Sequence, residues 1–552
     1  MRMGSLGFFF FFIYFLLCTV VIAVLFFSQA MMSGSYRSLG MFKKIFLIFF
    51  VLLITVDGAS ICSEILKNCF DIDEQSSSTV DDKIEDVESR ISRLERRFRA
   101  MEQPVWQIRG WPGDWEVCVE GPCKCQPETK SISCWNDELD DVPPAQLIPQ
   151  DSIKIDLGNN HLTALHRDTF RDLTELRDLD LSNNMIEHLP LNIFYSLDSL
   201  TNLRISKNLL RDLHQSQFLR MRHLQILDLS SNKFIALPDD LFITNTILVL
   251  LEISSNRIST LPKTIFNGLQ NLEELFLSKN RLTSLNSYAL KDLINLKTLR
   301  LDENRIRNIQ PGTFDKQINL IELNLRDNHL TSLPSSLFLH LKYLKSLDLS
   351  SNMISRIDKD AMKGLGSLKE LRLGKNQIKS ITKKMFLSTP SLQNLVLYAN
   401  KIENISNGDF QGLKNLTLLF LHSNKIRYLE SDSLQDILNL QKLQLEGNHL
   451  SYLPSHLFDN LNSIQQLRLA RNPWDCNCDA SYLATWLRKM YFSHLNITSN
   501  NDNRYNYWES GGGAICWGPG MLGGKLVAEL SYAELCQGQW ASMKGLRPRK
   551  KI

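Results

Sequence analysis

The sequence predicts an α/β solenoid: a leucine-patterned stack of short parallel strands, curved like a horseshoe, with a capping module at each end. Two observations support this prediction. Asparagine recurs every 24 residues at fourteen positions without an insertion or deletion, and self-similarity at such a period is typical of solenoids. Cysteines lie before and after this region, with none between 135 and 475. The asparagines are Asn160, Asn184, Asn208, Asn232, Asn256, Asn280, Asn304, Asn328, Asn352, Asn376, Asn400, Asn424, Asn448 and Asn472.

Each asparagine lies in the pattern L-x-x-L-x-L-x-x-N-x-L/I of a leucine-rich repeat, as in LRDLDLSNNMI (176–186) and LQKLQLEGNHL (440–450). The apolar positions point inward from a short strand and its return loop, so one repeat cannot bury its own face and neighbours must stack. The asparagine amide is expected to pair with backbone groups of the adjoining turn. We therefore assign residues 151–472 to a repeat array with a parallel concave sheet.

A second column lies ten residues after each of the first thirteen asparagines and is mostly phenylalanine. Its regularity favours a stacked aromatic spine beneath the convex side over a ligand pocket. Its members are Phe170, Phe194, Phe218, Phe242, Phe266, Leu290, Phe314, Phe338, Met362, Phe386, Phe410, Leu434 and Phe458.

Two apolar stretches, 8–27 and 45–56, precede the repeats. The second follows Met41 and two lysines and ends near small residues, which predicts a signal peptide over 41–60. Residues 1–40 are then an upstream apolar extension that lies before the true start of translation. The alternative is that 8–27, which is long enough to cross a bilayer, is a retained anchor. Either way the chain beyond Ser60 is expected in the extracellular space or extracellular matrix.

Cysteine usage agrees with this compartment. Ten cysteines follow the upstream stretch that holds Cys18, an even number as disulfides require. Two lie in a linker (61–82), four in an N-terminal cap (118–150) and four in a C-terminal cap (473–536). A C-x-C pair can also bind zinc, but no matching second ligand pair follows, so no metal or cofactor is expected. Glycosylation sequons occur at Asn404, Asn415 and Asn496.

The cysteine motifs resemble the flanking modules of extracellular leucine-rich repeat proteins. CVEGPCKC (118–125) with SCW (133–135) is similar to their N-terminal module, and NPWDCNCDASYLATWL (472–487) with CWGPGMLGG (516–524) to their C-terminal module. This group includes Slit-like guidance proteins, the acid-labile subunit of growth-factor-binding complexes and the carboxypeptidase N regulatory subunit. The sequence departs from the group at Val119, usually proline, and in a polar stretch (496–513) expected to be a surface loop. The resemblance implies the disulfides Cys118–Cys125, Cys123–Cys134, Cys476–Cys516 and Cys478–Cys536.

Alternation along each strand sends a central column of residues to the concave surface, the usual binding face of this architecture. The beginning of this column is acidic, which indicates either a contact site or an ordinary solvated face. Further along, an apolar island interrupts it. Exposed apolar patches often mark interfaces, so we predict ligand contact there, unless these side chains cover one another or lie under glycan. The island comprises Val396, Tyr398, Leu418, Phe420 and His422.

Apolar residues at alternating spacings of three and four predict a short coiled coil over 83–103. Basic residues at the g positions face acidic residues at the e positions, the pairing that a parallel homo-oligomer brings together. Cys62 and Cys69 could link such chains covalently or pair with each other. The alternative is a lone helix that packs on the N-terminal cap through a Trp-rich linker (104–117). The predicted oligomer interface is Ile84, Val87, Ile91, Leu94, Phe98 and Met101.

A formal net charge of +3 gives no reason to expect nucleic acid as a partner. No catalytic motif with usable spacing occurs, so an enzyme is not expected. These features predict a secreted scaffold that captures an extracellular protein ligand on its concave face and that forms an oligomer through the coiled coil. The alternatives are a non-catalytic carrier subunit of a secreted enzyme complex, or a membrane-anchored adhesion or guidance receptor. The basic tail (537–552) either binds sulfated glycans or anionic surfaces or is a plain disordered end.

Overall fold

A computed structural model describes residues 115, 118, 123–141, 148–495 and 511–536. The chain divides into two compact units, Met1–Ser89 and Arg90–Ile552, and every described residue belongs to the second. The sequence-based assignments that lie outside the described residues are the upstream extension, the signal peptide (41–60), Cys62, Cys69, the coiled coil (83–103), Val119, Asn496 and the basic tail (537–552).

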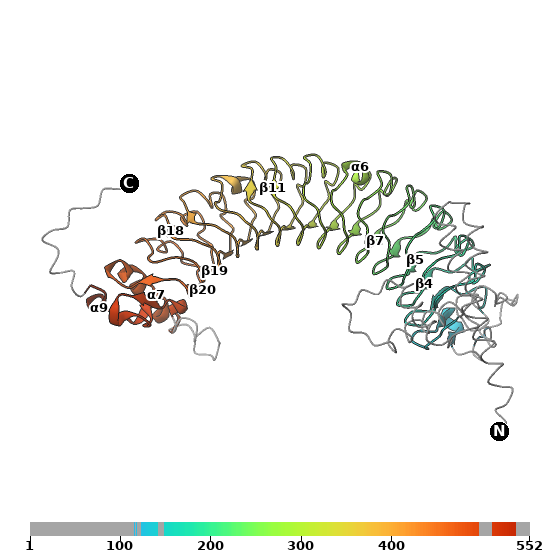
Figure 1. The fold of residues 1–552 in the computed structure, drawn as a ribbon, viewed down its shortest axis with the longest axis horizontal. Coiled ribbons are helices and arrows are strands. Elements are labelled where there is room, and N and C mark those ends of the chain that lie inside the picture. The colour runs from blue at the N-terminus through green and yellow to red at the C-terminus, as the bar shows by residue number, and fades with distance from the viewer. Residues whose placement is uncertain (1–114, 116–117, 119–122, 142–147, 496–510, 537–552) are drawn as a thin grey trace, which may run out of the picture. The chain divides into compact units, whose positions relative to one another are not determined.

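One 16-stranded sheet runs through the described part of this unit, and its strands are ordered as in the chain. The first pair is antiparallel and every later pair is parallel, in a register that advances by one repeat, as for Leu299 beside Leu323. These strands line the inner side of the repeat array (Figure 1). They are β1 Lys124–Gln126, β2 Ser131–Ser133, β3 Lys154–Asp156, β4 Asp178–Asp180, β5 Asn202–Arg204, β6 Ile226–Asp228, β7 Leu250–Glu252, β8 Glu274–Phe276, β9 Thr298–Arg300, β10 Glu322–Asn324, β12 Ser346–Asp348, β14 Glu370–Arg372, β15 Asn394–Val396, β17 Leu418–Phe420, β19 Lys442–Gln444 and β20 Gln466–Arg468.

The asparagine ladder binds each repeat to the one before it. Asn304 Nδ2 donates to the carbonyl oxygens of Leu301 and Asp302 in its own turn and of Leu277 in the preceding repeat, at 3.0, 3.3 and 2.9 Å. Its Oδ1 accepts the backbone N–H of Leu282 at 3.0 Å. The side chain is buried, so these bonds satisfy backbone groups that water cannot reach. The predicted role of the asparagine is confirmed.

The column ten residues after each of the first thirteen asparagines is buried throughout, with exposed fractions of 2% or less. Adjacent phenylalanine rings stack, as in Phe218 and Phe242, whose ring centroids are 6.0 Å apart with planes inclined by 14°. At the end of the array Phe458 packs on Trp486 of the C-terminal cap, with centroids 4.9 Å apart. The spine is therefore part of the core.

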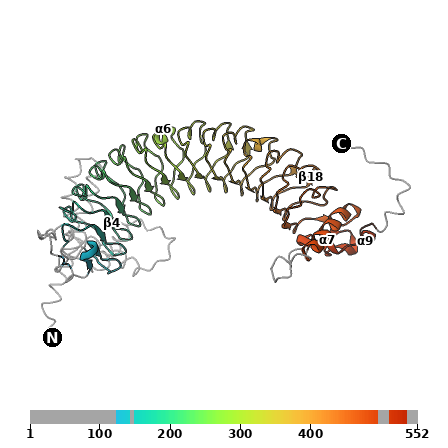
Figure 2. The same ribbon diagram turned by 180° about the vertical axis from the view of Figure 1, so that it is seen from behind.

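The outer side of the array holds turns and short elements instead of continuous helices (Figure 2). Two small parallel sheets form there, β11 with β13 and β16 with β18. The bounds are β11 Ser332–Leu333, β13 Arg356–Ile357, β16 Asn404–Ile405, β18 Tyr428–Leu429, α6 Ser287–Leu290 and the 3-10 helix η3 Met385–Ser388.

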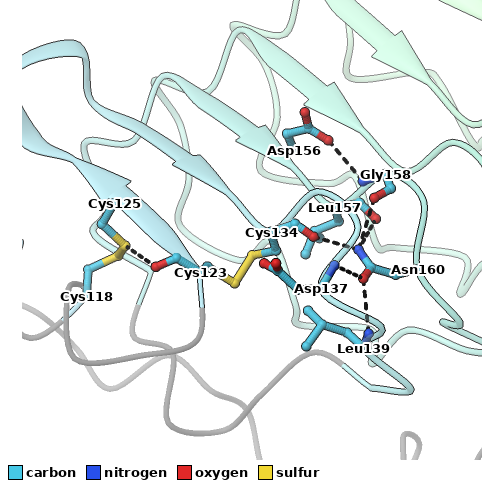
Figure 3. Close-up of a disulfide and its surroundings, with 10 residues drawn as sticks. All are labelled: Cys118, Cys123, Cys125, Cys134, Asp137, Leu139, Asp156, Leu157, Gly158 and Asn160. Atoms are coloured by element: carbon cyan, nitrogen blue, oxygen red, sulfur yellow. Dashed lines mark hydrogen bonds between the residues drawn. A yellow bond between two sulfur atoms is a disulfide. The ribbon is translucent and has the colours of Figure 1, made fainter.

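The N-terminal cap closes the first repeat with a disulfide-linked hairpin (Figure 3). Strands β1 and β2 pair with each other, and β2 then pairs with β3. Asn160 reaches into the cap, where its Nδ2 donates to the Cys134 carbonyl at 2.7 Å and its Oδ1 accepts the N–H of Leu139 at 3.0 Å. Trp115 is buried and donates from Nε1 to Asp151 at 3.1 Å. The cap thus continues the ladder. Among the described residues of the cap, the one regular element besides these strands is the 3-10 helix η2 Pro127–Thr129.

The C-terminal cap covers the other end of the sheet. Leu469, beyond β20, donates its N–H to the Gly512 carbonyl at 2.8 Å, and the buried Trp474 donates from Nε1 to the Leu469 carbonyl at 3.1 Å. Tyr482 accepts the Phe458 N–H at 2.8 Å, and burial raises the pKa of its hydroxyl above the usual value. The elements are β21 Trp474–Asp475, η4 Cys478–Ala480, α7 Ser481–Leu495, η5 Gly511–Gly513, β22 Cys516–Gly518, η6 Gly520–Leu522, η7 Val527–Glu529 and α9 Tyr532–Cys536.

Four disulfides hold the two caps, and they join the cysteines that the family resemblance implies. None of them joins one repeat to another, so sheet hydrogen bonds, the asparagine ladder and core packing hold neighbouring repeats together. The pairs are Cys118–Cys125, Cys123–Cys134, Cys476–Cys516 and Cys478–Cys536.

Candidate ligand-binding face

The central column of the concave face is the third residue of each repeat strand. Parallel register places its members side by side across the sheet, so that Val396 is opposite Arg372 on one side and Phe420 on the other. The residue in the middle of each repeat strand is buried, and the first and third residues are half-buried or exposed, except for the buried Asp348. The column, in chain order, is Asp156, Asp180, Arg204, Asp228, Glu252, Phe276, Arg300, Asn324, Asp348, Arg372, Val396, Phe420, Gln444 and Arg468.

The structure brings the five residues of the apolar island together. Leu418 and Phe420 share one face of β17, and Val396 pairs with Phe420 across the sheet. Tyr398 and His422, two residues beyond the strands, stack with ring centroids 4.8 Å apart and planes inclined by 6°. The Phe420 ring lies 6.3 Å from the His422 ring and is tilted by 56°. All five side chains are half-buried, so they cover one another in part and still present an apolar surface.

Gly374 makes room for the Tyr398 ring. A Cβ at Gly374 would lie 2.5 Å from Tyr398 Cε1, closer than real Cβ contacts come. The same position one repeat earlier is Ser350, and one repeat later it is Tyr398 itself. The missing side chain therefore allows the Tyr398 ring to lie over the neighbouring repeat. The sequence analysis did not predict a role for Gly374. The signal was present: in the column of equivalent positions 24 residues apart, which is rich in serine, a glycine is followed by a tyrosine.

Burial favours the neutral form of His422. It lowers the pKa of the imidazole; Glu446 opposes this shift and Arg468 adds to it. Within the described structure His422 Nδ1 is buried without a hydrogen-bond partner. Glu446 forms an ion pair with Arg468 at 3.6 Å. The aromatic island therefore favours a neutral imidazole and has charged groups at one border.

The acidic residues of the first repeats serve the fold. The carboxylate of Asp180 accepts the backbone N–H of Ser182, two residues later, at 2.8 Å, and Asp228 accepts that of Ser230 at 2.9 Å. Desolvation raises the pKa of Asp156 and of Glu252, which make the same bond to the residue two positions on. These acids bind the turn that follows each strand, as Asp side chains commonly do in turns.

Arginines neutralise or cover other parts of the column. Arg204 Nη1 lies 3.4 Å from Asp178 and 3.9 Å from Asp180. The guanidinium of Arg300 lies over the Phe276 ring at 5.5 Å from its centroid. Phe276 therefore belongs to the same column, but a charged guanidinium covers its aromatic ring.

The two described sequons lie outside the concave sheet. Asn404 is exposed in β16, which belongs to a separate two-stranded sheet. Asn415 is also exposed, precedes β17, and donates from Nδ2 to the Pro390 carbonyl at 2.9 Å. A glycan on either asparagine would start away from the strands that carry the island.

No group of three or more His, Cys, Asp or Glu side chains in the described ranges is placed to hold a metal ion. Over the same residues, no helix combines the length and apolarity needed to cross a bilayer.

Comparisons with known proteins agree with this geometry. The leucine rich repeat family model matches residues 154–210, 198–251, 246–306, 294–334, 318–378, 366–426 and 414–473, which together exceed half of the chain. No match was found among the curated proteins.

Two solved structures of the complex of Toll with Spatzle from Drosophila have a similar fold. One matches with a TM-score of 0.60 and 23% identity over 73% of this chain and 54% of that chain. Its glycosylated form matches with a TM-score of 0.56 and 24% identity over 69% and 51%. This chain therefore spans about half the length of those two chains. The fold and the repeat matches lead to one conclusion: the chain belongs to the leucine rich repeat family.

Proposed function

We propose that this chain is a secreted, non-catalytic scaffold that captures an extracellular protein ligand on its concave face. The aromatic island around Phe420 is the main contact site, and the ligand covers the half-buried rings. Protein chains joined through the coiled coil (83–103) would present several such faces and gain affinity by avidity.

The observation that carries this proposal is a change of chemistry within one structural column. In six repeats a column member accepts the N–H two residues further on: Asp156, Asp180, Asp228, Glu252, Asn324 and Asp348. Val396 and Phe420 have no acceptor in their side chains, so they give up a bond worth about 1 kcal/mol. These half-buried side chains still leave apolar surface exposed, and aromatic residues at a surface are effective binding anchors.

The size of the face suits a protein ligand. Fourteen parallel repeat strands at roughly 4.8 Å spacing extend over a distance on the order of 60 Å. In the Toll structures a protein of the same fold is seen in complex with Spatzle. That likeness supports a protein as the class of ligand, with no implication for its identity.

Disulfides and caps support the extracellular assignment. Four disulfides join the caps, and such bonds persist in oxidising compartments. Together with the signal peptide assigned to 41–60, they favour secretion. The match between these pairings and the resemblance supports a relation to the Slit-like and acid-labile-subunit-like proteins with cysteine-rich caps.

A capture experiment tests the contact site. The secreted protein is incubated with its native extracellular fluid, and the bound proteins are identified for the wild type and for Phe420→Ser with Tyr398→Ser. Tyr343→Ser is the matched control, because Tyr343 is 60% exposed and lies outside the island. We expect the double variant to lose the ligand and the control to retain it. Unchanged capture by the double variant would exclude the island, and a stoichiometric enzyme among the captured proteins would support the carrier-subunit alternative.

The oligomer is tested by size under non-denaturing conditions, with and without reductant. We expect a mass that is a multiple of the chain mass. If Cys62 or Cys69 links the chains covalently, the oligomer should resist dissociation before reduction and lose that resistance after it. A monomer under both conditions contradicts this part of the proposal.

A further inference from the structure

We propose that the C-terminal cap also contacts a lipid bilayer: Trp517 and Met521 enter the interfacial region, and the basic tail (537–552) is drawn to anionic headgroups. This inference is independent of ligand capture on the concave face. It concerns the loop between Cys516 and Lys525, called the cap tip below.

The cap tip holds the two most exposed large apolar side chains of the described residues. Trp517 is 82% and Met521 is 94% exposed. Ile515, just before β22 and two residues before Trp517, is 48% exposed. Side chains this exposed make no contribution to the core, so folding gives no reason for tryptophan and methionine at these positions.

The tip is closed at its base. Cys516 N–H donates to the Lys525 carbonyl and Gly524 N–H donates to the Cys516 carbonyl, both at 2.9 Å. The disulfide to Cys476 ties this base to β21. Within the tip, Leu522 packs against the core and its N–H donates to the Pro519 carbonyl at 3.2 Å. Trp517 and Met521 therefore project from a braced turn.

The composition of the tip suits a bilayer. Its sequence, CWGPGMLGG (516–524), contains no charged residue. Tryptophan is enriched where proteins meet the membrane–water interface, because its ring is amphipathic. A flat protein partner would leave two projecting side chains uncovered unless it had a pocket for each, whereas a fluid lipid layer closes around them.

Charge supplies the second signal. Lys525 at the base of the tip lies 3.8 Å from Glu534 of α9, and α9 ends at Cys536, where the tail begins. The tail (537–552) contains five basic residues and no acidic one: Lys544, Arg547, Arg549, Lys550 and Lys551. The chain after Cys536 is therefore cationic by sequence, and the last described helix before it, α9, is paired with the base of the tip. A weak apolar insertion and a basic segment together give stable membrane attachment where either alone is marginal.

Vesicle binding tests the proposal. Protein purified from culture medium is sedimented with vesicles of phosphatidylcholine, or of phosphatidylcholine with about 30% phosphatidylserine. We expect binding to the anionic vesicles that weakens with salt. Trp517→Ser with Met521→Ser should lower the partition coefficient by about tenfold or more, and removal of 537–552 by a similar factor. The matched control is Tyr288→Ser with Met353→Ser, two exposed apolar residues of the repeats, which should bind as the wild type does.

Insertion has its own signature. Lipids brominated near the headgroup should quench part of the tryptophan fluorescence of the wild type, and that part should be missing in Trp517→Ser. Far-ultraviolet circular dichroism checks that each variant is folded, as expected for side chains this exposed.

Several outcomes overturn the proposal. One is absence of vesicle binding by the wild type, and another is binding that does not change in the Trp517 and Met521 variant. Binding to heparin that needs the tail but not the tip would identify a sulfated glycan as the occupant. Self-association lost in Trp517→Ser would identify a second copy of the chain, and capture of a soluble protein through Trp517 would identify a protein partner.

Discussion

Strands β3 to β7 and strands β15 and β17 have the same backbone register but present different chemistry on the concave face. In the first region the column residues are mostly carboxylates that bind their own turns, as Asp228 binds Ser230. In the second region the same position holds Val396 and Phe420, beside the stacked rings of Tyr398 and His422. The same scaffold therefore carries a polar surface whose carboxylates are hydrogen-bonded to their own turns, and an apolar surface without such bonds. The proposed contact site lies in the apolar region.

The largest expected effect tests whether the two regions share one scaffold. Asn232→Leu and Asn400→Leu each remove an amide that donates to three carbonyls and accepts one N–H. Because these backbone groups would stay buried and unpaired, each variant should lose about 3 kcal/mol of unfolding free energy. Urea unfolding measures both. Clearly unequal losses would mean that the regions differ in their cores as well as on their surfaces.

The second test moves the aromatic stack. Gly374→Ala forces the Tyr398 ring away from its place, which should weaken ligand capture and cost about 1–2 kcal/mol of stability. Gly158→Ala is the matched control at the equivalent position of the first repeat, where the nearest atom to a Cβ is Asp156 Oδ1 at 3.1 Å. It should affect capture little. If both variants captured ligand like the wild type, the stack would not be part of the contact site.

The third test exchanges the chemistry of the column. Asp228→Ala leaves the N–H of Ser230 without its acceptor and should cost about 1 kcal/mol without changing capture. Phe420→Asp gives the second region the acceptor of the first, so its stability should be equal or higher while capture is lost. Thermal unfolding and ligand pull-down measure the two properties separately. A Phe420→Asp variant that both unfolds earlier and retains ligand would reverse the proposed division.

The smallest expected effect concerns pH. The folded state lowers the pKa of His422, so the unfolded chain binds a proton first as pH falls below the ordinary histidine pKa of about 6.5. Stability from this residue is present above that pKa and is lost between it and the lower folded pKa. The urea midpoint of the wild type should therefore fall more between about pH 7.5 and 5.5 than that of His422→Gln. Equal falls would show that His422 contributes nothing to the pH dependence.

Most of the fold follows from the sequence because a repeat of constant length fixes the register. Once the asparagine of one repeat is placed, every strand and the buried column at Phe218 or Phe386 are placed as well. The island residues were also predictable, since register alone brings Val396 beside Phe420.

What the sequence left open depends on side-chain direction. A pattern of letters does not say that Asp180 turns back to its own backbone, that Arg300 covers Phe276, or that Tyr398 extends over Gly374. These are rotamer choices made among neighbours. The exposure of Trp517 was hidden for a similar reason, because the cap is irregular and has no periodicity from which an outward face can be inferred.

The asparagine ladder gives the chain a direction of assembly. Every donor bond of Asn304 goes to a carbonyl in its own turn or in the repeat made before it, and its acceptor bond goes to the earlier Leu282. A chain that emerges from the ribosome from its N-terminus thus meets each asparagine when the asparagine's partners already exist. Each new repeat can be fastened to its predecessor as soon as it is synthesised, and the N-terminal cap is complete in time to serve as the template for the first.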